Sequence, residues 1–111
     1  MPPSALAVRR ARKSDLEAIA AVENLSFDVD RFSRSALKRL LAVMTADCRV
    51  AEIDGRVAGY VAILFRAGTL VARIYSIAVD PAYRGRGVAQ GLIAAAEQAA
   101  RSRGARSLRL E

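Results

Sequence analysis

With 111 residues the chain is long enough for one modest domain with a hydrophobic core, and its single cysteine, Cys48, excludes an internal disulfide. The absence of histidine excludes serine–histidine and cysteine–histidine nucleophilic chemistry, and histidine-built zinc sites, within this chain. The formal net charge of +7 either favours a polyanionic partner, such as nucleic acid, the ribosome or a phosphate-rich cofactor, or reflects a composition bias shared across a proteome.

The chain begins with a pattern that predicts a strand and then two helices. Apolar residues alternate with small or polar ones around Val8, which indicates a short strand. Ser14 to Glu17 has the form of a capping box, so a first helix should be capped by Ser14 and run to about Leu25. Ser33 is expected to cap a second helix. The apolar residues that share one face of this second helix are Leu37, Leu40, Leu41 and Met44.

Three consecutive strands are predicted next. Cys48 to Ile53 has the composition of a strand, and Asp54-Gly55 is a strong two-residue hairpin signal. The returning strand covers Arg56 to Arg66, and after a second turn a third β-rich segment runs from Leu70 to Val79. These segments should be strands of one sheet.

A long amphipathic helix and a short strand complete the pattern. The apolar positions of the helix are Val88, Leu92, Ile93, Ala96, Ala99 and Ala100. Gly104 is expected to end this helix. Ser107 to Glu111 predicts a strand parallel to Leu70–Val79, because a helix connects the two. The order β-α-α-β-β-β-α-β predicts an α/β (α+β) fold with one mixed sheet, in a single domain that covers residues 1–111.

The loop before the long helix carries the chemistry. Arg84-Gly85-Arg86-Gly87 places two glycines and two cations directly in front of a helix N-terminus. The first turn of a helix has unpaired N–H groups, and the helix dipole makes that end attractive to anions. Glycines let a bulky phosphate approach the backbone, so the loop suits a pyrophosphate. The alternative is that the glycines only let the chain turn into the helix without strain and that the arginines are solvated.

Two common nucleotide-binding motifs do not fit this loop. The dinucleotide fingerprint needs a third glycine where Gln90 stands, and Gly91 comes one residue too late. The triphosphate-binding loop needs Gly-Lys-Ser or Gly-Lys-Thr, which the chain does not contain.

A longer stretch around the loop resembles a known family motif. Arg84 to Ala89 is similar to the Q/R-x-x-G-x-G/A motif of the GNAT-superfamily N-acetyltransferases. Ile77 to Pro81, together with Tyr83, matches the usual lead-in to that motif. The predicted order of elements also resembles the first five strands and three helices of the GNAT fold, so the resemblance covers nearly the whole chain.

The resemblance implies acetyl-coenzyme A (acetyl-CoA) as co-substrate. In this family the loop amides bind the pyrophosphate, the preceding strand pairs its backbone with the pantetheine arm, and N–H groups near Val79 are the implied oxyanion donors. Ile77 and Val79 are alternatively plain sheet core, and both roles are compatible. The implied cofactor-binding residues are Ile77, Ala78, Val79, Arg84, Gly85, Arg86, Gly87, Val88, Ala89 and Gln90.

Within the superfamily the chain is most similar to the ribosomal-protein N-terminal alanine acetyltransferases (RimI-like). Segments around Phe27 to Ser33 and Leu108 to Glu111 carry this similarity. It implies Glu111 as the catalytic base, acting through a water. The alternative is a surface glutamate at the chain terminus. Phe27, Asp30 and Tyr75 are implied to face the acceptor, although Tyr75 would also fit in the core.

The chain departs from the family pattern at its end. GNAT folds continue into a fourth helix and a hairpin, which supply an asparagine that contacts the cofactor and a tyrosine general acid. We therefore expect the fold to be incomplete after its fifth strand, and a homodimer to form through that strand's edge.

The favoured function is transfer of an acetyl group from acetyl-CoA to a primary amine, with a protein N-terminal α-amine as first choice and a small amine as second. At pH 7 neutralising a lysine amine costs roughly 4.6 kcal/mol, against about 1.4 kcal/mol for an α-amine. The alternatives are a catalytically impaired coenzyme A-binding fragment and a basic nucleic-acid or ribosome-binding module. Scattered arginines disfavour nucleic acid, and the longest apolar run is too short for a membrane span. The single cysteine fits a reducing compartment, so we expect a cytoplasmic protein.

Overall fold

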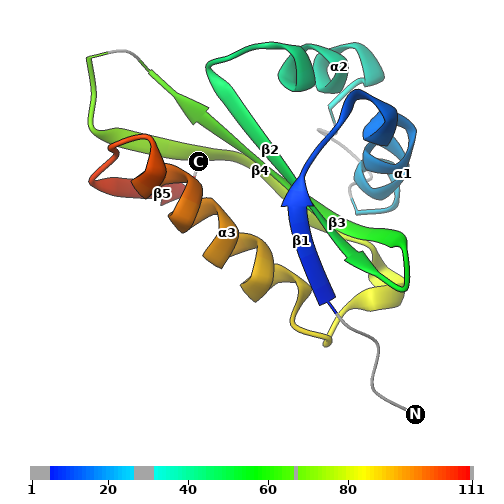
Figure 1. Cartoon of the computed structure of the whole chain (residues 1–111). Coiled ribbons are helices and arrows are strands. Elements are labelled where there is room, and N and C mark those ends of the chain that lie inside the picture. The colour runs from blue at the N-terminus through cyan, green and yellow to red at the C-terminus, as the bar shows by residue number, and fades with distance from the viewer. Residues whose placement is uncertain (1–5, 27–31, 67, 111) are drawn as a thin grey trace.

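The computed structural model describes residues 6–26, 32–66 and 68–110, which form a five-stranded sheet and three α-helices (Figure 1). The strands are β1 (Leu6–Arg10), β2 (Ala46–Ile53), β3 (Arg56–Phe65), β4 (Val71–Val79) and β5 (Ser107–Leu110). The helices are α1 (Leu16–Ser26), α2 (Arg34–Ala42) and α3 (Val88–Ser102). The predicted order of elements and the α/β class are confirmed.

The sheet has the simple order β1-β2-β3-β4-β5. Strands β1 to β4 pair antiparallel, with α1 and α2 in the connection between β1 and β2 and short turns between the later strands. Strand β5 pairs parallel with β4, as predicted, because α3 carries the chain back across the sheet. The homodimer expected through β5 stays a prediction. In the described parts of the chain no helix is both long and apolar enough to cross a membrane.

Helices cover both faces of the sheet, so the protein has two hydrophobic cores (Figure 1). On one face α3 packs on the sheet through buried residues such as Leu92, Val61 and Ile74. On the other face α1 and α2 pack on the sheet, where Leu37 and Ala62 are buried. Side chains alternate along a strand, so the neighbours Val61 and Ala62 serve opposite cores.

A β-bulge interrupts β4 near its middle. Ala62 pairs with Ser76, but the next residue of β3, Ile63, pairs with Ile74, so Tyr75 is an extra residue in β4. Because the bulge adds one residue, Ile74 still faces α3, while Tyr75 and Ser76 both lie on the face that α1 and α2 cover. The bulge therefore brings two consecutive side chains to the same face.

Several local predictions are confirmed. Ser33 is the N-cap of α2 and accepts the N–H of Ala36 at 3.1 Å. Asp54 and Gly55 have φ of 54° and 78°, as a tight primed turn requires. Gly104 has φ of 83° directly after α3.

Two predictions about the first helices are wrong. Ser14 is not an N-cap, since it lies in a 3-10 turn before α1, and the carboxylate of Asp15 accepts the N–H of Arg12 at 2.7 Å. Asp15 is held there by two hydrogen bonds from the Arg9 guanidinium, both 2.8 Å, which a sequence pattern does not reveal. Met44 lies beyond the end of α2 and is 88% exposed, so it does not share the buried face of that helix.

Candidate active site

The loop between β4 and α3 leaves the start of α3 open. Asp80 accepts the N–H of Ala82 at 2.9 Å and begins a 3-10 turn, Pro81–Tyr83. Gly85 and Gly87 both have φ of 79°, a conformation that L side chains rarely adopt. Gly87 is the N-cap residue of α3, and no side chain caps the helix at this position. The glycines thus turn the chain into the helix without covering its first turn.

The first amides of α3 border a pocket of about 580 Å³. Within the helix the first hydrogen bond joins the N–H of Gly91 to the carbonyl of Gly87 at 3.0 Å, so the preceding amides have no partner in the helix itself. The pocket is lined by Val79, Tyr83, Arg84, Gly85, Gly87, Val88, Ala89 and Gln90. All the predicted cofactor-binding residues except three therefore surround one cavity.

The three exceptions are Ile77, Ala78 and Arg86. The Arg86 guanidinium lies over the Tyr83 ring, 5.7 Å from its centroid, and does not line the pocket. Ile77 packs against the α3 core and Ala78 is buried in the opposite core, because successive side chains of a strand alternate. A cofactor contact at Ile77 or Ala78 would therefore use backbone atoms.

The backbone at the end of β4 presents polar groups away from β3. The N–H of Asp80 donates to the carbonyl of Ala58 at 2.8 Å, and N–H and C=O directions alternate along a strand. The backbone groups of Ile77 and Val79 consequently point to the other side, where β5 pairs with β4 only as far as Ile74. No described strand pairs with this edge beyond that residue. The Val79 carbonyl already accepts the Ser26 hydroxyl at 3.0 Å, and the other outward groups can receive an extended ligand that enters beside the bulge.

Gly59 on β3 sets how closely α3 approaches the sheet, and it is not among the predicted site residues. A β-carbon at this position would lie 2.7 Å from the carbonyl oxygen of Ala78 and 3.0 Å from Cγ1 of Val88. Only glycine therefore lets the first turn of α3 rest on β3 and β4. A glycine inside a strand pattern is the signal that could have found it.

A buried polar cluster lies on the other face of the sheet. Glu23 of α1 is 1% exposed, and its Oε1 accepts the Tyr60 hydroxyl at 2.6 Å. The Tyr60 hydroxyl also lies 2.8 Å from the Ser76 hydroxyl. The other carboxylate oxygen of Glu23 accepts the N–H of Phe32 at 2.7 Å. Burial and the Glu23 carboxylate raise the pKa of Tyr60, so this hydroxyl stays protonated and can donate.

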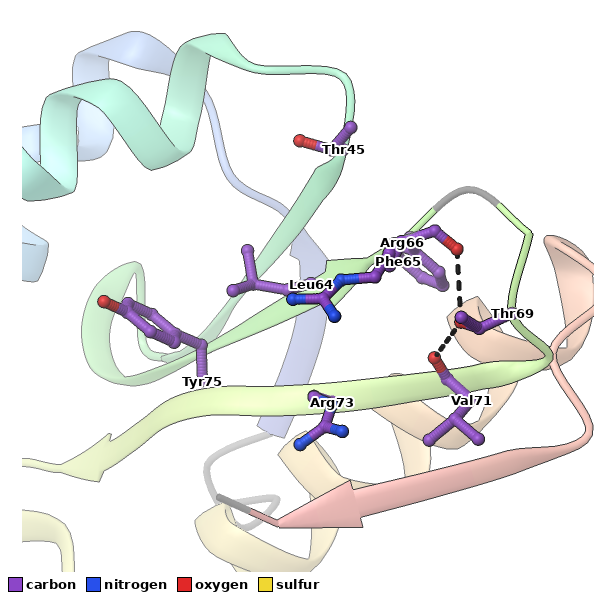
Figure 2. A pocket seen from close by; sticks show the side chains of 8 residues that line it. All are labelled: Thr45, Leu64, Phe65, Arg66, Thr69, Val71, Arg73 and Tyr75. Atoms are coloured by element: carbon purple, nitrogen blue, oxygen red, sulfur yellow. Dashed lines mark hydrogen bonds between the residues drawn. The ribbon is translucent and has the colours of Figure 1, made fainter.

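A second, open pocket of about 740 Å³ lies beside Tyr75 (Figure 2). Figure 2 shows the Arg66 guanidinium next to Leu64 and Tyr75 at one end of the pocket, which Arg73 also lines. Tyr75 is 40% exposed, and its ring stacks on Phe32 with centroids 4.8 Å apart. The structure therefore places Tyr75 at a surface and not in the core.

Three further predicted site residues, Phe27, Asp30 and Glu111, lie outside the described residues. Leu110, which precedes Glu111, pairs with Ile74, the residue before Tyr75. The single cysteine is not a nucleophile candidate, because burial raises the pKa of Cys48 to about 11 and keeps its thiol protonated.

Comparison with known proteins points to one family. A sequence profile of the acetyltransferase (GNAT) family matches residues 16–111. A protein of Bacillus subtilis (strain 168), provisionally named a ribosomal protein bS18-alanine N-acetyltransferase, is 33% identical over 105 residues, which cover 95% of this chain and 68% of that protein.

Solved structures of such enzymes share the fold. The ribosomal-protein-S18-alanine N-acetyltransferase of Escherichia coli superposes with a TM-score of 0.84 at 19% identity, over 96% of this chain and 66% of that one. The aminoglycoside N-acetyltransferase AAC(6')-Iy, solved with CoA, superposes with a TM-score of 0.82 at 22% identity, over 99% and 78%. The chain thus spans about two thirds of the length of the two ribosomal-protein relatives.

Proposed function

The chain belongs to the acetyltransferase (GNAT) family, and from this premise we propose that it transfers the acetyl group of acetyl-CoA to a primary amine, with a protein N-terminal α-amine as the acceptor. The observation that carries the proposal is the pocket at the start of α3. It combines unpaired helix amides, two glycines with positive φ and the Arg84 side chain, all on the family's motif residues.

The pocket suits the pyrophosphate of coenzyme A. Helix N-terminal amides and the helix dipole attract phosphate, and Arg84 adds a cation that can form charge-assisted hydrogen bonds. From there the pantetheine arm would run along the outward backbone groups of Val79 and Ile77, past the bulge. The thioester would then lie near Tyr75, at the edge of β4.

The reaction needs a neutral amine and a donor for the developing oxyanion. The amine nitrogen attacks the thioester carbonyl carbon, the C–S bond breaks, the amine gives up a proton, and coenzyme A leaves as its thiol. Of the N–H groups near Val79 that point away from β3, that of Ile77 is the one next to the bulge and is the proposed oxyanion donor. Glu111 is the proposed base, because the residue before it, Leu110, pairs with Ile74.

An α-amine is favoured as acceptor over a lysine side chain or a polycationic small amine. Its lower pKa makes deprotonation at pH 7 about 3 kcal/mol easier than for lysine. The pocket beside Tyr75 is lined by Arg66 and, among the described residues, by no carboxylate, which disfavours a ligand of high positive charge. The relatives named for ribosomal-protein alanine acetylation support the same choice. We place the reaction in the cytoplasm.

The proposal is tested with two peptides of equal length and an independent binding measurement. One peptide has a free N-terminal alanine and no lysine, and the other has an acetylated N-terminus and one lysine. We expect acetyl transfer to the first to be at least about tenfold faster. Equal rates would refute the α-amine preference. Coenzyme A binding in calorimetry without transfer to any amine would instead favour the coenzyme A-binding fragment.

A further inference from the structure

Helix α1 is attached to β4 at two positions that flank its cofactor-facing stretch. The Ser26 hydroxyl donates to the carbonyl of Val79 at 3.0 Å. One turn earlier on α1, Glu23 reaches Ser76 through the Tyr60 hydroxyl, with contacts of 2.6 and 2.8 Å. Both attachments come from the same end of α1, so this end fixes the bulged part of β4.

Glu23 also holds the residue that packs on Tyr75. Its Oε2 accepts the N–H of Phe32 at 2.7 Å, and the Phe32 ring stacks on Tyr75 at 4.8 Å between centroids, with the ring planes 27° apart. Tyr75 is followed directly by Ser76, which completes a closed set of contacts back to Glu23 through Tyr60. One carboxylate thus joins α1, the start of α2 and the bulge.

We infer that Glu23 is a positioning residue that fixes the Phe32–Tyr75 ring pair at the acceptor side of the active site. The acceptor assignment of that side rests on the proposed function, whereas the effect of Glu23 on the ring pair does not. Without the carboxylate, the Phe32 N–H and the Tyr60 hydroxyl lose their shared acceptor, and the two rings lose the contact that sets their position.

The geometry does not fit Glu23 as the base. Both carboxylate oxygens already accept hydrogen bonds, from Tyr60 and from Phe32. The side chain is 1% exposed, so an amine in the open pocket does not reach it. Glu23 therefore acts through its hydrogen-bond partners, Tyr60 and Phe32. A glutamine at this position can make the same two contacts. Its carbonyl oxygen accepts the Phe32 N–H, and its NH₂ group donates to a Tyr60 hydroxyl that turns toward Ser76.

The test compares Glu23→Gln and Glu23→Ala in the full chain, with Glu97→Ala as matched control because Glu97 is exposed on α3. The chain has three tyrosines, so incorporation of 3-fluorotyrosine gives three ¹⁹F signals, and Tyr75→Phe assigns the one of interest. Phe32→Leu removes the ring and supplies the shift of an unstacked Tyr75. We expect Glu23→Ala to move the Tyr75 signal toward that value, and Glu23→Gln and Glu97→Ala to leave it in place.

Kinetics provide the second readout. Glu23→Ala should raise the acceptor KM about five- to tenfold, with the Kd for coenzyme A within about twofold of wild type, and Glu23→Gln should restore the acceptor KM. An unmoved Tyr75 signal in folded Glu23→Ala would overturn the inference. So would a collapse of kcat in Glu23→Gln at unchanged KM, which would indicate a proton-transfer role. If the wild-type chain transfers no acetyl group, the proposed function fails, but the ¹⁹F arm still decides the role of Glu23.

Discussion

Replacing Gly59 with alanine should weaken coenzyme A binding although this residue does not line the cofactor pocket. The added β-carbon would lie 2.7 Å from a backbone oxygen of β4, 3.0 Å from Val88 and 3.1 Å from Leu92. The first of these neighbours is backbone, so it cannot rotate away, and the close contacts with Val88 and Leu92 push the first turn of α3 off the sheet. Overpacking of this kind typically costs about 1–3 kcal/mol of unfolding free energy.

The same displacement moves the helix amides that would bind the pyrophosphate. Losing one or two hydrogen bonds of about 1 kcal/mol each should reduce coenzyme A affinity about five- to thirtyfold. The control is Gly104→Ala at the other end of α3, where φ is 83° and nothing lies within 4 Å. Its left-handed strain should also cost about 1–2 kcal/mol of stability, but far from the pocket.

The assays are urea unfolding for stability and calorimetric titration with coenzyme A for affinity. We expect both variants to lose stability and Gly59→Ala alone to lose affinity. If the two variants bind coenzyme A equally well, the packing at Gly59 does not set the position of the α3 amides, and the predicted loss of affinity is wrong.

The remaining predictions concern the loop and the Asp15 cluster. Gly87→Val should abolish coenzyme A binding in calorimetry, because φ at this position is 79° and a β-branched residue cannot adopt it without strain; unchanged affinity in a folded variant would contradict the pocket assignment. Asp15→Asn should lower the free energy of unfolding at pH 7 by about 2 kcal/mol, since Asp15 accepts two hydrogen bonds from Arg9 and one from the Arg12 N–H. The Arg9 hydrogen bonds lower the pKa of Asp15 in the folded state, so its stabilisation is complete above 3.8, the unperturbed pKa, and is lost as the pH falls further. Urea unfolding at pH 7 and pH 3 should therefore show a smaller difference between wild type and variant at pH 3, and a constant difference would refute this assignment.

The sequence by itself determined the features that depend on neighbouring residues. The Asp54-Gly55 turn, the Ser33 cap and the glycine after α3 follow from φ preferences and hydrogen bonds within a few residues. The loop Arg84–Gly87 belongs to this class as well, because a strand end, two glycines and a helix start are all local. That is why most of the predicted cofactor residues surround one pocket.

Tertiary structure decided the features that join residues far apart in the chain. The Tyr60–Glu23 hydrogen bond spans 37 positions and the Ser26–Val79 contact spans 53, so no local pattern contains them. In the sequence Gly59 is only a glycine within a strand pattern. The need for a glycine there becomes visible only when α3 packs on it. The bulge at Tyr75 arises from the register between β3 and β4. Burial removes water as a competing partner, so buried polar groups such as Glu23 must form hydrogen bonds with residues of other helices and strands. Only the packed fold determines which residues these are.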